Sequence, residues 1–179
     1  MESIRRQPIQ ERGKERYQLI IQATQRLVGS RGNDQVSIRD IAKAAGVAPS
    51  SIYQYFDDKH AIIVAIMSEY FDRSYELLAA QTSQANSLQE WVEAIENSVD
   101  YFLAMLQEDP GWATIWSGIQ ASPALREFDN QDAMRNATLL KEQLMAFCPH
   151  LSDKEALSAC LLLVQTAGLT ARMALFSDT

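Results

Sequence analysis

The sequence predicts an all-α protein, with a small N-terminal part of three helices and a larger C-terminal helical part. Apolar residues recur at helical spacing along nearly every segment, and no stretch alternates for long as a strand would. Ser, Asp and Pro stand where the helices should begin. The 179 residues, 47% hydrophobic and 22% charged, are typical of a soluble chain with a substantial core. We place the boundary between the parts after residue 58, which gives domains 1–58 and 59–179.

The N-terminal part is expected to hold three helices, over about residues 11–30, 38–44 and 49–55. One face of the first carries the apolar side chains Leu19, Ile20, Ala23, Leu27 and Val28. Ser37 is the expected N-cap of the second helix, and Asp40 three residues later completes an acidic variant of the capping box. Gly46 supplies a tight turn, and Pro49 suits the first position of the third helix, where a missing N–H costs nothing.

Five further helices are expected, over about residues 58–82, 87–107, 110–120, 123–147 and 153–176. The fourth of these is expected to be interrupted near the stretch "FDNQD". The core stripe of the second is expected to be Leu88, Val92, Ile95, Val99, Phe102 and Leu106. The last helix is apolar almost all round, so we expect it to be covered on every side, by its own domain and by a second subunit.

The net charge of −7 hides an asymmetry along the chain. Residues 1–60 hold ten Lys and Arg against seven Asp and Glu, whereas residues 61–179 hold six against sixteen. A basic N-terminal third on an acidic body indicates a polyanion partner for one end only.

The two cysteines, Cys148 and Cys160, are too few for a disulfide framework and have no His or Cys neighbours at metal-ligand spacing. We interpret them as buried thiols of a reduced, cytoplasmic protein that needs no metal or cofactor. No apolar run comes near the roughly 20 residues that a membrane helix needs, so no membrane association is expected. The basic residues at the start are not followed by an apolar stretch, so no signal peptide is expected.

Two short helices joined by a glycine-containing turn form a helix-turn-helix, whose second helix enters the DNA major groove. The positions expected to face inward are Ile38, Ile41, Ala42, Val47 and Ile52. This leaves an outward share for Ser50, Ser51, Tyr53, Gln54 and Tyr55. Hydroxyl groups can donate to phosphate oxygens, and Gln54 can pair with a base edge, adenine by preference. Lys59 can reach a phosphate as a point charge, and first-turn N–H groups near Ser37 and Pro49 can meet phosphates too.

The stretch "VSIRDIAKAAGVAPSSIYQYFDDKHAII" resembles the DNA-binding module of the TetR (tetracycline-repressor-like) family of bacterial regulators. The positions that match in register are Ser37, Ile41, Ala42, Ala45, Gly46, Val47, Ile52, Tyr53, Tyr55, Phe56 and Lys59. The match covers about residues 12–65, a third of the chain. Ala48 departs from the usual capping Ser, and Ile62 or Ile63 stands where Leu is common.

The candidate DNA-binding residues are therefore Ser37, Ser50, Ser51, Tyr53, Gln54, Tyr55 and Lys59. The resemblance implies that Tyr53, Tyr55 and Lys59 contact the DNA backbone, and that Ser51 and Gln54 lie nearest the bases or their flanking phosphates. Two alternatives stay open, because Tyr53 can be purely structural and Gln54 can simply face solvent. Cations of the N-terminal arm would either add phosphate contacts or stay solvated: Arg5, Arg6, Arg12, Lys14 and Arg16.

Beyond residue 65 the resemblance is to the architecture of the family, which implies a helical domain that binds a small molecule and dimerises. Candidate effector-binding residues are Phe102, Met105, Trp116 and Met134, for each of which ordinary core packing is the open alternative. An apolar site of this kind suits a hydrophobic effector. The resemblance thus implies a homodimeric repressor that a small, largely hydrophobic effector releases from a palindromic operator on double-stranded DNA.

Two other classes of function are alternatives to this one. An enzyme is disfavoured because the sequence has no H-E-x-x-H motif, no paired Glu-x-x-His and no nucleophile elbow, and its two histidines, His60 and His150, lie far apart. The second rival is a helix-turn-helix interaction module that has lost DNA binding.

Overall fold

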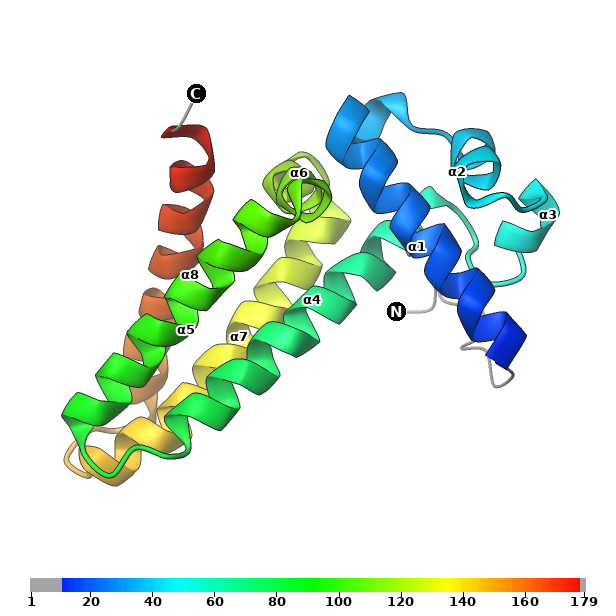
Figure 1. Cartoon of the computed structure of the whole chain (residues 1–179). Helices are drawn as coiled ribbons and strands as arrows, with labels where there is room; N and C mark the ends of the chain where they lie inside the picture. The colour runs from blue at the N-terminus through cyan, green and yellow to red at the C-terminus, as the bar shows by residue number, and fades with distance from the viewer. Residues whose placement is uncertain (1–10, 178–179) are drawn as a thin grey trace. The chain divides into compact units, whose positions relative to one another are not determined.

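The structure, a computed structural model, describes residues 11–177 and is shown in Figure 1. Arg5 and Arg6 of the N-terminal arm lie outside the described residues. The helices in chain order are α1 (Glu11–Arg31), η1 (Asn33–Gln35), α2 (Ile38–Ala45), α3 (Pro49–Ile52), α4 (Lys59–Thr82), α5 (Leu88–Glu108), α6 (Pro110–Gly118), η2 (Ile119–Ala121), α7 (Pro123–Phe147) and α8 (Asp153–Ser177). Residues 11–177 contain no strand, which confirms the all-α prediction.

The chain forms two compact units. Among the described residues, the head unit comprises residues 11–70 together with Asp109–Ala121, and the body unit comprises Phe71–Glu108 and residues 122–177. The helix α4 begins in the head unit and ends in the body unit. These two units are defined by packing alone. The predicted division into functional domains 1–58 and 59–179 is a separate matter and stays a prediction.

The head unit has a core of aliphatic and aromatic side chains from α1, the helix-turn-helix and the start of α4. Its fully buried members include Ile20, Ile21, Ile41, Ile52, Phe56, Ile62 and Ile66. The buried face of α1 differs from the predicted one at Leu19, which is 46% exposed. The side chain of Thr24 is buried on this face. Its hydroxyl can be buried because it donates a hydrogen bond to the Ile20 carbonyl of the same helix at 2.8 Å.

The short helix α6 packs on α1 within the head unit. Asp109 is its N-cap and accepts a hydrogen bond from the Trp112 N–H at 3.0 Å. The same carboxylate accepts from the Tyr70 hydroxyl and, at 3.3 Å, from the Gln25 amide. The Tyr70 ring stacks on Trp112 with centroids 4.4 Å apart. One carboxylate therefore ties α1, α4 and α6 together.

The body unit is built around a core cluster of Leu78, Trp91, Ile95, Ala137, Leu140 and Cys160. The predicted stripe on α5 is wrong at Leu88 and Val92, each 42% exposed. The helix instead buries Trp91, whose indole N–H donates to Gln143 Oε1 at 2.9 Å. Ile95 and Leu106 of the predicted stripe are buried as expected, so the stripe changes only at its start, where the larger ring with its polar edge satisfied takes the core position.

The helix α7 is continuous from Pro123 to Phe147, so the interruption predicted near "FDNQD" is wrong. The polar side chains of this stretch make hydrogen bonds or ion pairs within α7 or to α8, so they do not compete with the backbone hydrogen bonds of the helix. Gln131 donates to Glu127 one turn earlier at 3.1 Å. Asp129 accepts from Arg172 of α8 at 3.4 Å. Ser122 caps the start of the helix by accepting from the Leu125 N–H.

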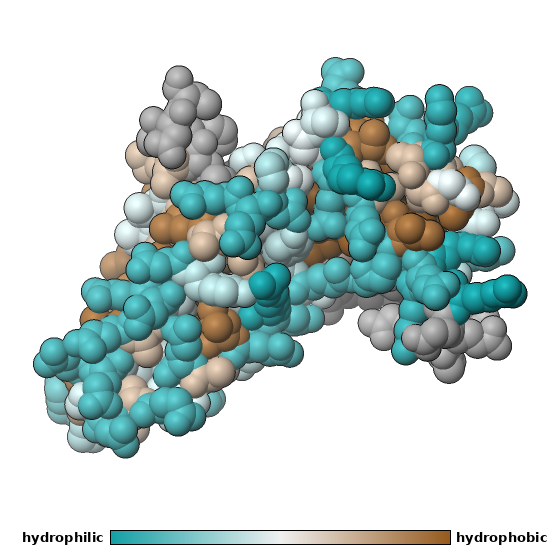
Figure 2. Space-filling model, viewed as in Figure 1, coloured by the Kyte–Doolittle hydropathy of each residue, from teal (hydrophilic) through white to brown (hydrophobic). Residues whose placement is uncertain are grey.

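The helix α8 leaves much of its apolar surface uncovered in a single chain. Its exposed apolar side chains are Leu162, Leu163, Leu169 and Met173. Figure 2 shows brown, apolar patches over α5 and α8 among hydrophilic side chains. By length and composition alone, Asp153–Ala174 could cross a membrane, which corrects the expectation that no apolar run comes near that length. One such helix is weak evidence for a membrane protein.

The two cysteines are both free. Cys160 is buried in the body-unit core, as predicted, and burial raises the pKa of its thiol. Cys148, at the end of α7, is only half-buried, because the chain turns there toward exposed Pro149 and His150. The prediction of two buried thiols is therefore right for one of them.

Candidate nucleic-acid interface

The helix-turn-helix begins at a complete capping box. Ser37 Oγ accepts from the Asp40 N–H at 3.2 Å, and Asp40 Oδ2 accepts from the Ser37 N–H at 3.0 Å and from its hydroxyl. These bonds from Ser37 hold the pKa of Asp40 below its usual value. Ser37 is exposed, but its hydroxyl is already engaged in starting α2.

The turn after α2 depends on Gly46, which has a left-handed φ of 67°. The next N–H, that of Val47, bonds to the Ala42 carbonyl at 3.0 Å. Pro49 occupies the first turn of α3, as predicted, while Ala48 provides no side-chain cap.

The third helix is shorter than the predicted 49–55, since α3 ends at Ile52. The N–H groups of Tyr55 and Phe56 both bond to the Ile52 carbonyl, at 2.9 and 3.0 Å. Two donors on one carbonyl tighten the chain into a turn where the helix would have continued. Tyr53 and Gln54 therefore stand on this turn.

The residues from Ser50 to Phe56 separate into an exposed face and a buried face. Ile52 and Phe56 are fully buried, whereas Ser50, Tyr53 and Gln54 are exposed, with Tyr53 at 47%. We call Ser50, Ser51, Tyr53, Gln54 and Tyr55 the reading face. It presents hydroxyl groups, an amide and a phenol to solvent, the groups that bind phosphates and base edges.

Tyr55 is half-buried, unlike Tyr53. Its ring meets Tyr17 of α1 edge-on with centroids 6.3 Å apart, and Tyr17 also packs on Phe56 at 5.1 Å. Burial, assisted by Glu69, raises the pKa of Tyr17 to about 12, so this phenol stays neutral. Tyr55 therefore belongs to the reading face and also packs against Tyr17 of α1.

Lys59 is the first residue of α4 and is also half-buried. Its ammonium donates to the backbone carbonyl of Asn33 at 2.7 Å. The structure thus places this candidate phosphate contact against the connection between α1 and α2.

Sequence reasoning missed two cations on α2. Arg39 and Lys43 are both exposed and lie one turn apart on its polar side. Their i, i+4 spacing, with each cation two residues before a buried position (Ile41 and Ala45), was the signal that could have found them.

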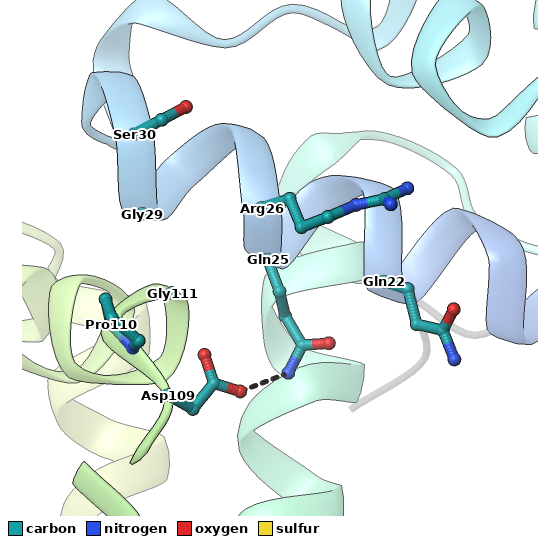
Figure 3. A pocket seen from close by; sticks show the side chains of 8 residues that line it. All are labelled: Gln22, Gln25, Arg26, Gly29, Ser30, Asp109, Pro110 and Gly111. Carbon is teal, nitrogen blue, oxygen red and sulfur yellow. Dashed lines mark hydrogen bonds between the residues drawn. The ribbon is translucent and has the colours of Figure 1, made fainter. Parts of the chain in front are cut away.

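The head unit also has an open cavity of about 570 Å³ between α1 and the start of α6, lined by Gln22, Gln25, Arg26, Gly29, Ser30, Asp109, Pro110 and Gly111. In Figure 3 the Gln25 amide points to Asp109, while Arg26 and Gln22 extend along α1 away from it. Several lining residues have polar side chains, but the surface that they expose to the cavity is mainly apolar, and none of the four predicted effector residues lines it.

The four candidate effector residues are distributed over three helices. Phe102 and Met105 lie one turn apart on α5, half-buried and buried respectively. Met134 of α7 is 43% exposed, and Trp116 of α6 belongs to the head unit. The effector site built from these residues stays a prediction.

Two family models match the chain. One, described as bacterial regulatory proteins of the tetR family, matches residues 20–66. The other, described as a tetracyclin repressor-like C-terminal domain, matches residues 89–178. The first contains the whole helix-turn-helix, and the second contains α6, α7, α8 and all of α5 but its first residue.

Curated relatives match part of the chain. The chain is 44% identical over 59 residues to the HTH-type transcriptional regulator YvdT of Bacillus subtilis, covering 33% of this chain and 29% of that protein. It is 30% identical over 109 residues to the HTH-type transcriptional regulator BetI of Brucella canis, covering 60% of this chain and 54% of that protein. The matches thus span about half, or less, of these relatives.

Solved structures show the same fold over most of the chain. FadR, a fatty acid degradation regulator from Bacillus halodurans, aligns with a TM-score of 0.75 at 24% identity, covering 91% of this chain and 86% of that one. FadR from Bacillus subtilis, solved in complex with stearoyl-CoA, aligns with a TM-score of 0.75 at 21% identity, covering 90% and 88%. At this identity the likeness concerns the fold alone.

Proposed function

Because this chain belongs to the TetR family of bacterial regulatory proteins, we propose that it is a DNA-binding transcriptional regulator. The observation that carries the proposal is the reading face, where Tyr53 and Gln54 are exposed directly beside fully buried Ile52 and Phe56. The buried side chains of Ile52 and Phe56 hold the reading face rigid. The polar groups of the reading face point to solvent, where they are available to hydrogen-bond to DNA. Such a surface is suited to a DNA groove.

Each part of the reading face has a separate role in this proposal. Gln54 reads a base edge, since its amide can donate and accept at once. Ser50, Ser51, Tyr53 and the hydroxyl of Tyr55 bind the phosphate backbone. Ser37 supports the N-terminus of α2, whose first-turn N–H groups face a phosphate. Arg39 and Lys43 of α2 add the positive charge that phosphate binding requires.

The protein acts as a homodimer in this proposal, and α8 supplies the contact. Leu162, Leu169 and Met173 are 69%, 57% and 63% exposed and follow one another at helical spacing, seven and four residues apart. A second copy of the same helix would cover them by two-fold contact. The two reading faces would then meet half-sites about one DNA turn apart, on the order of 34–36 Å, in a palindromic operator.

Regulation in this proposal comes from a small, largely hydrophobic effector in the C-terminal part, residues 59–179, while residues 1–58 bind DNA. Support comes from the apolar side chains of α5 and from the fold shared with FadR of Bacillus subtilis, solved with stearoyl-CoA. Effector binding would release a cytoplasmic, non-enzymatic repressor from its operator. The effector can shift the equilibrium between the DNA-binding state and the released state only by the difference between its binding free energies to the two, typically about 1–3 kcal/mol.

The test is selection of bound fragments from genomic DNA by the purified protein. The expected result is enrichment of a few fragments that share a two-fold symmetric sequence. A protein with Tyr53→Ala and Gln54→Ala together, carried through the same selection, should enrich none of them. Equal enrichment by both proteins, or none by the wild type, would contradict the proposal.

A further inference from the structure

Three aromatic rings of the head unit pack together where the reading face meets α1. They belong to Tyr17 of α1, to Tyr55 and to Phe56. The Tyr17 and Phe56 ring centroids lie 5.1 Å apart. The Tyr17 and Tyr55 centroids lie 6.3 Å apart, with the two ring planes nearly perpendicular, at 84°. Rings that meet edge to face at such a distance attract each other beyond the effect of their buried area.

The position of the Tyr17 ring is set by the core of the head unit. Phe56, on which the ring packs, is fully buried. Ile20 and Ile21, about one turn further along α1, are buried as well, so this part of α1 is fixed against the core. The Tyr17 ring therefore connects an anchored core ring to Tyr55, a ring of the reading face.

The backbone alone does not orient the Tyr55 side chain. Tyr55 lies on the turn between α3, which ends at Ile52, and α4, which begins at Lys59. Its N–H bonds to the Ile52 carbonyl at 2.9 Å, which fixes the main chain but leaves the torsion χ1 of the side chain free. Tyr53 on the same turn is 47% exposed, whereas Tyr55 is half-buried beside Tyr17. Ring packing therefore orders Tyr55 before DNA binds, so that ordering costs no entropy on binding.

The hydroxyl of Tyr17 has no part in this packing. It makes no hydrogen bond to any of the described residues. Burial and the nearby Glu69 carboxylate raise its pKa to about 12, so it stays neutral. What Tyr17 contributes to the reading face is therefore its ring.

We infer that Tyr17 of α1 is a positioning residue of the reading face, whose ring holds the Tyr55 phenol in the orientation in which it binds a DNA phosphate. The inference rests on the proposed function, which gives the Tyr55 hydroxyl its phosphate. It assigns α1 a part in DNA affinity through side-chain packing. The loss of the Tyr17 ring should cost the Tyr55 contact, whereas the loss of the Tyr17 hydroxyl alone should cost nothing.

The first test needs no DNA and compares Tyr17→Leu with Tyr17→Phe. Leucine keeps an apolar side chain without a ring, and phenylalanine keeps the ring without the hydroxyl. Three-bond NMR couplings to Cγ of Tyr55 report whether χ1 occupies one rotamer or several. They should indicate a single rotamer in wild type and in Tyr17→Phe, and averaged rotamers in Tyr17→Leu, as for the exposed Tyr53. A single Tyr55 rotamer in Tyr17→Leu overturns the inference.

The second test is a double-mutant cycle on one duplex recovered from genomic DNA by the wild type. Tyr55→Phe removes the phosphate-binding hydroxyl and should weaken binding about tenfold, as the loss of a hydrogen bond to a charged group implies. Tyr17→Leu should weaken binding by a similar factor, and the double variant by no more than either, because both changes remove one contact. Tyr17→Phe should bind like wild type, and so should Tyr101→Leu, which removes a half-buried ring of the body unit.

Three results of the cycle overturn the inference. In the first, the double variant loses about a hundredfold in affinity, because the two tyrosines then act independently. In the second, Tyr17→Phe loses as much as Tyr17→Leu, because the hydroxyl then carries the effect. In the third, Tyr55→Phe binds like wild type, because no phosphate contact is then there to position. A wild type that binds no duplex fails the proposed function instead, and the couplings still decide whether Tyr17 orients Tyr55.

A further measurement covers the case in which Tyr17→Leu does not fold. In the wild type, nuclear Overhauser contacts between the ring protons of Tyr17 and Tyr55 are recorded before and after the duplex is added. Contacts that persist in the complex support the inference. Contacts that vanish when DNA binds overturn it, because Tyr55 then leaves Tyr17 to reach the phosphate.

Discussion

Gly29 of α1 and Gly111 of α6 lie in direct backbone contact within the head unit. A Cβ atom on Gly29 would lie 2.9 Å from Gly111 Cα, and one on Gly111 would lie 2.4 Å from the Gln25 carbonyl oxygen. Both distances are too short for a side chain unless the backbone moves. Beside them, Asp109 accepts from Gln25 of α1 (Figure 3) and from Tyr70 of α4. The two glycines and this carboxylate set the spacing of α1 and α6.

Gly111→Ala should destabilise the protein by about 1–3 kcal/mol, because the new methyl group meets backbone atoms that cannot rotate away. Gly118→Ala is the matched control, since it lies in the same helix and a Cβ there meets nothing within 4 Å. Alanine is the better helix former, so the control should be neutral or stabilising by up to about 1 kcal/mol. Urea unfolding measures both, and equal stability of the two variants would contradict the close contact.

Asp132 of α7 makes the stability of the body unit depend on pH. Burial raises the pKa of Asp132 to about 7, with Asp129 and Asp72 adding to the effect of burial and Arg135 opposing it. The unfolded chain ionises near pH 4, so the native state binds the extra proton between about pH 4 and 7. The contribution of this group to stability is therefore highest below pH 4 and falls as pH rises toward 7.

Asp132→Asn should remove that dependence, because an amide does not titrate and can still accept the bond that Asn136 makes at 3.0 Å. Relative to wild type, the variant should gain stability as pH rises from about 4 to 7 and level off above that, with a slope of at most about 1.4 kcal/mol per pH unit. Thermal unfolding at several pH values measures the difference. Asp100→Asn, which removes an exposed carboxylate of α5, is the matched control. A difference that stays constant with pH would refute this assignment.

Leu169→Glu should convert the proposed dimer into a monomer. The side chain is 57% exposed in the single chain, so a carboxylate costs little there until a second copy tries to bury it. Sedimentation equilibrium should give twice the 20.1 kDa chain mass for wild type and the chain mass for the variant. Leu88→Glu places the same charge at a 42% exposed leucine of α5 and should stay dimeric. A monomeric wild type would remove α8 as the interface.

The parts of the fold that the sequence predicted are those decided by neighbouring residues. The capping box of Ser37 and Asp40, the turn at Gly46 and the start of α3 at Pro49 all depend on local chemistry. The bounds of the long helices were close for the same reason. The burial of Ile41 and Ile52 followed from helical spacing together with the family pattern.

The parts that could not be predicted depend on contacts between distant residues. From the sequence, Asp109 and Gly111 in "EDPG" only mark the end of a helix. In the structure, Asp109 accepts a hydrogen bond from Gln25, and Gly111 packs against the Gln25 backbone, some 84 positions earlier in the chain. The choice of Trp91 over Leu88 and Val92 for the core depends on Gln143. In the candidate interface, the half-buried state of Tyr55 depends on Tyr17, and the engagement of Lys59 depends on Asn33.

Titration of a labelled duplex decides whether the reading face contacts DNA. The duplex is one recovered from genomic DNA, used as selected and with single base pairs changed, against wild type, Tyr53→Ala, Gln54→Ala and the control Gln84→Ala of the body unit. Tyr53→Ala should weaken binding to every duplex by a similar factor, because a backbone contact carries no sequence information. Gln54→Ala should abolish a preference of about 1–3 kcal/mol at one position in each half-site. Affinities and preferences unchanged from wild type in both variants would contradict the account.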